Sequence, residues 1–190
     1  LQIARTAQGD LLETARDRFQ VYRQAFAPAR WRRMQETGVR NLADKDVLCC
    51  VNGAFSKRWF DVAVSNGKEA DQLTAELGKP ILPEMLRDAL KKKHYEAITI
   101  VHNETSTGLE NPVKELAAAV REVSPDTFIL VDAVSSLGGT KIEMDAWDID
   151  FLMTSSQKCL ALPPGLSLAG VNDRAMEKAA TVKNRGWYFD

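Results

Sequence analysis

Short, strongly apolar segments alternate with amphipathic stretches along most of this chain. The apolar segments are expected to form strands, and they lie at residues 47–51, 97–101, 128–131, 149–153 and 166–171. The amphipathic stretches are expected to form helices, and they lie at residues 55–64, 83–92, 112–123 and 173–182. Strands this apolar are typical of a sheet that is buried on both faces. The alternation therefore predicts an α/β fold, with a mostly parallel sheet covered by helices on both faces.

Polar segments directly follow several of these strands. Ligands of parallel α/β sheets bind beyond the carboxyl ends of the strands, so these segments are where a site is expected. Phe55 follows the Asn52-Gly53 turn and is placed to cover a flat ligand, although a core aromatic is the more ordinary explanation for one such residue. The polar run from His102 to Gly108 offers hydroxyl and amide groups to a ligand, or else it caps a helix.

Two further strand ends carry charged side chains. Asp132 ends an apolar segment, and a carboxylate buried there is costly unless it meets a cation, such as a protonated pyridine nitrogen, or several backbone amides of a turn. Lys158 lies between the polar residues before it and a Pro-Pro-Gly turn at residues 163–165. Burial beside the strand end would lower the pKa of its amine and free the lone pair to attack an aldehyde. A solvated surface lysine is the alternative.

Four sequence motifs occur in an order that resembles a known family. They read NGAFSKRW, HNETSTG, VDAVSSLGG and SSQKCLALPPG, and together they resemble the class V aminotransferases, enzymes of fold type I that use pyridoxal 5'-phosphate (PLP). The resemblance covers about residues 34–190 and is strongest to the alanine–glyoxylate, serine–pyruvate and phosphoserine aminotransferases. It implies a PLP-binding large domain at residues 34–190, a homodimer, and small amino acids and 2-oxo acids as substrates.

The resemblance also implies a role for each of several residues. Lys158 would form the Schiff base with PLP and carry the proton between the substrate and the cofactor. Asp132 would pair with the pyridine nitrogen, Phe55 would stack on the ring, Thr105 would bond its phenolic oxygen and Gln157 would contact the phosphate. The activity implied is transfer of an amino group from alanine or serine to a 2-oxo acid such as glyoxylate or pyruvate. Phosphoserine aminotransfer and a non-catalytic remnant of such an enzyme are the alternatives.

The chain departs from the family pattern in two places. Relatives carry a Ser-Gly-Thr loop that binds the phosphate, where this chain has Ala-Arg-Trp-Arg-Arg at residues 29–33. Arg30, Arg32 or Arg33 is the alternative phosphate contact. The chain also ends before the small C-terminal domain, where relatives keep the arginine that binds the substrate carboxylate. The PLP-binding domain is therefore expected to be incomplete, as a piece of something longer.

Residues 1–33 differ in composition from the rest of the chain. Apolar residues recur there at steps of three and four, which predicts an amphipathic N-terminal helical segment outside the family resemblance; they are Leu12, Ala15, Phe19, Tyr22 and Phe26. Packing against the domain or a partner subunit is the ordinary explanation for such a helix. A transit peptide or a membrane-surface helix is the alternative, which three acidic residues in the segment disfavour.

Charge and composition limit the remaining classes of function. A formal net charge of -1 gives no reason to expect nucleic acid or an anionic membrane as a partner. No apolar run is long enough to suggest a transmembrane helix, and no secretory signal is recognised. Three cysteines without a CxxC pair indicate a reducing, cytoplasmic location, and two histidines without metal-ligand spacing predict no zinc site.

Overall fold

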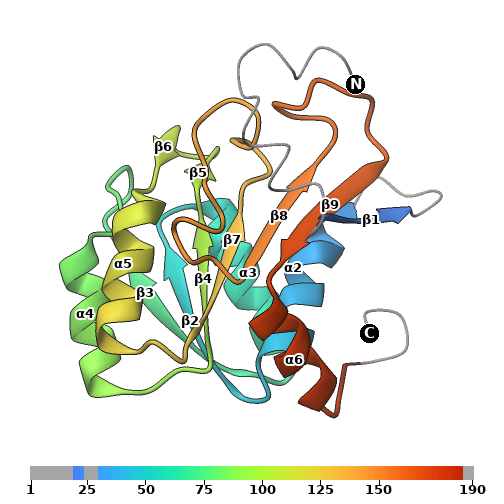
Figure 1. Ribbon diagram of the computed structural model, residues 1–190. Coiled ribbons are helices and arrows are strands. Elements are labelled where there is room, and N and C mark those ends of the chain that lie inside the picture. The colour runs from blue at the N-terminus through green and yellow to red at the C-terminus, as the bar shows by residue number, and fades with distance from the viewer. Residues whose placement is uncertain (1–18, 24–29, 186–190) are drawn as a thin grey trace.

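A seven-stranded sheet runs through the part of the chain that the computed structural model describes, residues 19–23 and 30–185 (Figure 1). The strands occur in the order β1-β9-β8-β7-β4-β2-β3 across the sheet. Their bounds are β1 (Phe19–Arg23), β2 (Asp46–Val51), β3 (Glu69–Thr74), β4 (Ala97–Val101), β7 (Phe128–Asp132), β8 (Phe151–Ser155) and β9 (Leu166–Val171). All neighbours from β3 to β8 are parallel, whereas β9 is antiparallel to β8 and to β1. The predicted mostly parallel sheet is confirmed.

Helices cover both faces of this sheet, as predicted. On one face lie α4 (Pro83–Lys92) and α5 (Val113–Val123), and on the other lie α2 (Arg30–Leu42), α3 (Ala54–Ser65) and α6 (Asp173–Thr181) (Figure 1). Alternate residues of a strand point to opposite faces, so β7 serves both layers: Ile129 and Val131 pack with α4 and α5, while Leu130 packs against α2 and α3. A short hairpin of β5 (Asn103–Glu104) and β6 (Leu109–Glu110) follows β4.

Besides β1 and the β5–β6 hairpin, strand β3 and helix α2 were not predicted. Strand β3 lies at an edge of the sheet and carries mostly exposed polar residues, so it lacks the apolar run of a central strand. Helix α2 contains Gly38 at its centre, and glycine normally disfavours a helix. A Cβ on Gly38 would lie 3.0 Å from Leu130 Cδ2 and 3.1 Å from Phe151 Cε1. The glycine therefore allows α2 to approach the sheet closely.

The predicted N-terminal helix is wrong at residues 19–23, whereas residues 30–33 are helical as the start of α2. Phe19–Arg23 form strand β1, which pairs with β9 from Phe19↔Gly170 to Arg23↔Leu166. Pairing with the free edge of β9 satisfies backbone N–H and C=O groups of this segment. The spacing of the apolar residues along the sequence does not reveal this partner strand. The remainder of the expected helix, including Leu12, Ala15 and Phe26, lies outside the described residues. Helix α2 crosses the predicted boundary at residue 33, and the division into two segments stays a prediction.

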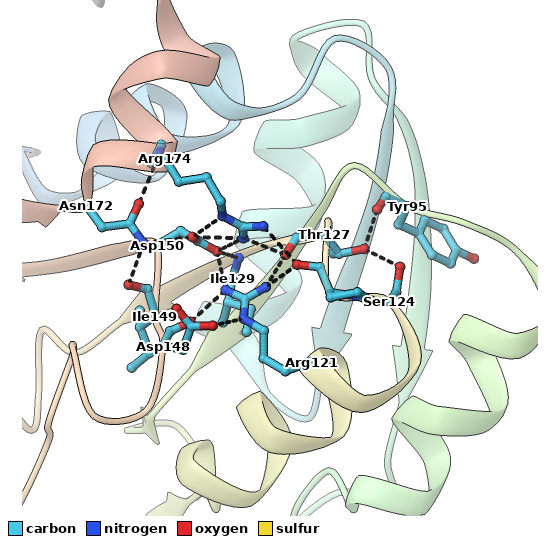
Figure 2. Close-up of polar contacts among 12 residues, drawn as sticks. Tyr95, Arg121, Ser124, Thr127, Ile129, Asp148, Ile149, Asp150, Asn172 and Arg174 are labelled. Atoms are coloured by element: carbon cyan, nitrogen blue, oxygen red, sulfur yellow. Dashed lines mark hydrogen bonds and ion pairs between the residues drawn. The ribbon is translucent and has the colours of Figure 1, made fainter.

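A buried carboxylate joins four elements at the amino ends of β7 and β8 (Figure 2). The Asp150 side chain accepts hydrogen bonds from Arg121 Nη2 at 2.7 Å, from Arg174 Nη2 at 2.8 Å and from the Ile129 amide at 2.7 Å. Asn172 donates to it as well, at 2.9 Å. Because the charge meets two guanidinium groups and further donors, its burial is compensated. This cluster fixes α5 and α6 to the end of the sheet opposite the carboxyl ends of these strands.

Candidate functional site

A cavity of about 190 Å³ opens beyond the carboxyl ends of β4, β7 and β8. It lies where the fold predicts a ligand site. The residues that line it are Phe55, Val101, Asn103, Thr105, Asp132, Val134, Ser135 and Lys158. The structure therefore brings together four of the five side chains expected to hold the cofactor. The fifth, Gln157, is half-buried beside Lys158 and is not one of the lining residues.

Asp132 ends β7 and is the buried carboxylate of this cavity, with 4% of its surface exposed. Its Oδ1 accepts a hydrogen bond from the Val134 amide at 2.9 Å, and its Oδ2 accepts one from Gln35 Nε2 at 2.9 Å. Burial raises the pKa of Asp132 to about 6, and these two bonds only partly offset it. An ionised carboxylate accepts about four hydrogen bonds, so Asp132 retains unused acceptor capacity at the cavity wall.

Phe55 is held in the wall by a second buried carboxylate, that of Glu104. The Phe55 amide donates to Glu104 Oε1 at 3.2 Å, and the Ser56 amide donates to Glu104 Oε2 at 2.9 Å. Burial raises the pKa of Glu104, but hydrogen bonds from Ser106, Ser56 and Phe55 outweigh it and hold the pKa below its usual value. A Cβ at position 53 would lie 2.3 Å from Glu104 Cγ, so only Gly53 admits this carboxylate to the start of α3. Negative charge at a helix N-terminus is stabilising.

The hydroxyl of Thr105 lies on the same wall and is paired with that of Ser135. Their oxygens are 2.7 Å apart, and the carbonyl oxygen of Ser135 accepts a hydrogen bond from Cys159 Sγ at 3.1 Å. Ser135 was quoted within a motif but was not predicted as a site residue, and neither was Asn103. Both follow the same strand ends as the predicted residues, and that position was the signal that would have identified them.

Lys158 lies in the turn after β8, with its side chain exposed. The Ser156 hydroxyl donates to the Pro163 carbonyl at 2.7 Å, which closes the loop that carries the lysine. The expected burial of Lys158 beside the strand end is wrong, because the residue is exposed in this turn. Lys158 nevertheless lines the cavity at the carboxyl ends of the strands, which is where the sequence predicted a ligand site.

His102 links the ends of β4 and β7 behind the cavity. Its backbone amide donates to the Asp132 carbonyl at 2.9 Å, and its Nδ1 is 2.9 Å from Ser136 Oγ. Burial lowers the pKa of His102, and Glu110, whose Oε1 is 3.5 Å from Nε2, opposes this effect. His102 is not one of the lining residues, so it supports the cavity without forming its surface.

Three arginines at the start of α2 were expected as alternative phosphate contacts, and the structure describes the side chain of one of them. The side chains of Arg30 and Arg32 lie outside the described residues, as does Ala29. Arg33 is described and is exposed in the first turns of α2. Within the described ranges, no three His, Cys, Asp or Glu side chains gather to hold a metal ion, and no helix is long and apolar enough to cross a membrane.

Known proteins resemble this chain in sequence and in fold. Residues 40–190 match the family model described as aminotransferase class-V. The chain is 40% identical to an uncharacterized aminotransferase of Methanocaldococcus jannaschii, over 76% of this chain and 37% of that protein. It is 35% identical to alanine–glyoxylate aminotransferase 1 of Saccharomyces cerevisiae, over 75% of this chain and 37% of the relative.

Among solved structures, an alanine–glyoxylate aminotransferase of a Nostoc species matches with a TM-score of 0.82 and 32% identity. That match covers 96% of this chain and 48% of the other. The chain thus spans less than half the length of these three proteins.

Proposed function

The chain belongs to the class V aminotransferase family, and on that premise we propose that it forms the PLP-binding core of a transaminase. The observation that carries the proposal is the buried carboxylate of Asp132 on the wall of a cavity that also presents the amine of Lys158. The fold type I likeness supports the same proposal, because the match to the Nostoc structure covers nearly the whole chain.

The residues of the cavity fit PLP. Asp132 has two hydrogen-bond donors among the described residues, and its raised pKa reflects a buried charge without a cation. A protonated pyridine nitrogen would supply that missing positive charge. The flat face of Phe55 suits an aromatic ring, and the hydroxyls of Thr105 and Ser135 suit a phenolic oxygen.

Each side chain would then act in a distinct way. When bound, PLP supplies an aldehyde and an electron-withdrawing ring. Lys158 Nζ would hold the cofactor covalently, and after an amino acid displaces it, Nζ would accept the proton from the substrate α carbon and return it. Asp132 would keep the ring nitrogen positively charged. Gln157 would contact the phosphate from the same turn as Lys158.

We take the amino donor to be a small amino acid of the alanine or serine type and the acceptor to be a 2-oxo acid such as glyoxylate or pyruvate. The name of the yeast relative supports an alanine donor and a glyoxylate acceptor. Phosphoserine aminotransfer and a non-catalytic remnant are the alternatives. A homodimer in the cytoplasm belongs to the same proposal, since the family resemblance implies that phosphate contacts come from a neighbouring subunit.

Absorbance of the purified chain with PLP, before and after borohydride reduction, tests the proposal. A visible Schiff-base band that borohydride fixes on Lys158, located by peptide mapping, supports it. Lys158→Ala removes the residue tested, and Lys141→Ala is the matched control because Lys141 is 70% exposed and is not a lining residue. The band should be lost in the first variant and kept in the second. Labelling scattered over surface lysines in the wild type would instead favour the remnant.

A further inference from the structure

Gln35, on the buried face of α2, makes an unusual contact with Asp132. Its Nε2 donates to Asp132 Oδ2 at 2.9 Å, across 97 positions of sequence. The side chain is fully buried, and the backbone carbonyl of Gln35 accepts a hydrogen bond from Trp59 Nε1 at 3.1 Å. Helix α2 and the indole of α3 therefore hold this amide against the carboxylate.

The other end of the same amide has no partner among the described residues. Gln35 Oε1 is buried and accepts no hydrogen bond there. An unsatisfied buried acceptor is costly, and an apolar side chain of similar length would fill the space without that cost. Gln35 is therefore poorly explained by packing and well explained by the hydrogen bond that its Nε2 donates to Asp132.

We propose that Gln35 is a positioning residue that keeps the Asp132 carboxylate ionised and directed at the cavity. This role rests on the proposed function only for the purpose of the Asp132 charge, which is to pair with a cationic ring nitrogen. The hydrogen bond fixes Oδ2, as the Val134 amide fixes Oδ1, so the carboxyl group cannot rotate freely. A donor to the charged form stabilises that form, which is the effect that Gln35 has on Asp132.

Few other charged or titratable groups face Asp132 within the described chain. Glu104 repels its negative charge and raises its pKa. Lys158 lines the same cavity, and His102 contacts Asp132 through its backbone amide. Glu104 opposes ionisation and Val134 contributes a single backbone amide. Among the described residues, the side-chain donor that favours the charged form is therefore that of Gln35.

Carbon-13 NMR titration of the Asp132 carboxyl group in the cofactor-free full chain tests this directly. Gln35→Met keeps the length of the side chain and removes the donor, so the Asp132 pKa should rise by roughly 1 to 2, the equivalent of one hydrogen bond to a charged group. Gln35→Glu is a second variant of nearly equal shape. This variant should raise the pKa of the Asp132 carboxyl group further, because two carboxyl groups in contact share one proton. Leu42→Ala weakens the packing of the same helix without touching Asp132 and should leave the titration unchanged.

An unchanged Asp132 pKa in both Gln35 variants would overturn the inference, as would an equal shift in Leu42→Ala. A merely structural role predicts loss of stability and no selective change in this titration. PLP absorbance of the wild type is measured separately. If the wild type binds no PLP while Gln35→Met still raises the Asp132 pKa, the proposed function fails and the positioning role stands. If the wild type binds PLP and the Asp132 pKa is unchanged in the Gln35 variants, the positioning role fails and the proposed function stands.

Discussion

Replacing Asp132 by asparagine should stabilise the cofactor-free chain at neutral pH. The carboxyl group has a pKa of about 6 in the folded chain, against an ordinary value of 3.8. Its pKa is raised by folding, so its contribution to stability is complete below about pH 4 and is lost as the pH rises through about 6. The difference of about 2 in pKa corresponds to about 3 kcal/mol of unfolding free energy at 1.36 kcal/mol each. Asparagine avoids this loss because it carries no charge.

The hydrogen bonds of the site can be kept in the variant. The side-chain oxygen of asparagine keeps the bond from the Val134 amide. Its amide nitrogen meets Gln35, and rotation of the Gln35 amide by half a turn presents Oε1, the oxygen that has no partner among the described residues. The variant therefore loses a buried charge and keeps one hydrogen bond to Gln35, with Nε2 in place of Oε1 as the end of the amide that has no partner among the described residues.

Urea unfolding followed by tryptophan fluorescence at about pH 4 and about pH 7 measures this effect, because Trp59 is buried in the core. The quantity compared is the free energy of unfolding of Asp132→Asn minus that of the wild type. This difference should be about 3 kcal/mol larger at the higher pH than at the lower. Asp88→Asn, at an exposed position of α4, should show no such change between the two pH values. A difference between variant and wild type that is independent of pH would refute the reasoning.

If the proposed function holds, the same substitution should impair transamination while stabilising the chain. If the ring nitrogen needs a negative partner, Asp132→Asn should cripple transamination and leave the Schiff base on Lys158 detectable by absorbance. Unchanged turnover would remove the role assigned to Asp132. Greater stability with lost activity is expected where a site stores an uncompensated charge.

Other substitutions test the remaining parts of the structure. Gly53→Ala should destabilise the chain by about 1–3 kcal/mol in urea unfolding, because the new Cβ meets Glu104 at 2.3 Å; equal stability would mean that the carboxylate does not need this glycine. Asp150→Ala should cost about 3–5 kcal/mol by the same assay, since it leaves Arg121 and Arg174 without their shared buried anion, and a loss below 1 kcal/mol would contradict the cluster of Figure 2. Lys158→Ala should change the unfolding free energy by less than about 0.5 kcal/mol while removing the borohydride-fixed adduct; a large loss of stability would show that the exposed lysine has a structural role.

The central strands and their helices could be predicted because burial on both faces leaves a continuous apolar run. Strand β4 matches its predicted bounds, and so do β9 and α4. The misses occur where the decisive contact is with a distant segment. β1 exists through its pairing with β9, and α2 depends on the close approach that Gly38 permits. Local periodicity carries no information about either contact.

The candidate site divides in the same way. Phe55, Thr105, Asp132 and Lys158 follow strand ends, so the topology itself brings them to one edge of the sheet. Gln35 lies on a helix and reaches Asp132 from the other direction, and its polarity resembles that of any surface helix residue until the helix is placed. The exposure of Lys158 was missed because sequence patterns predict the strand and the turn but not the direction of a side chain after the turn.

The pairing of β1 with β9 has a consequence for the order in which the chain folds. Phe19 pairs with Gly170, and subtracting 19 from 170 gives a separation of 151 residues. Protein synthesis at roughly 5–20 residues per second delivers β9 roughly 8–30 s after β1. During that interval β1 has no partner strand, whereas β2 and β4 already emerge close together in sequence. The edge of the sheet that β1 forms is therefore expected to close last, after the parallel centre has formed around the ends of β4 and β7.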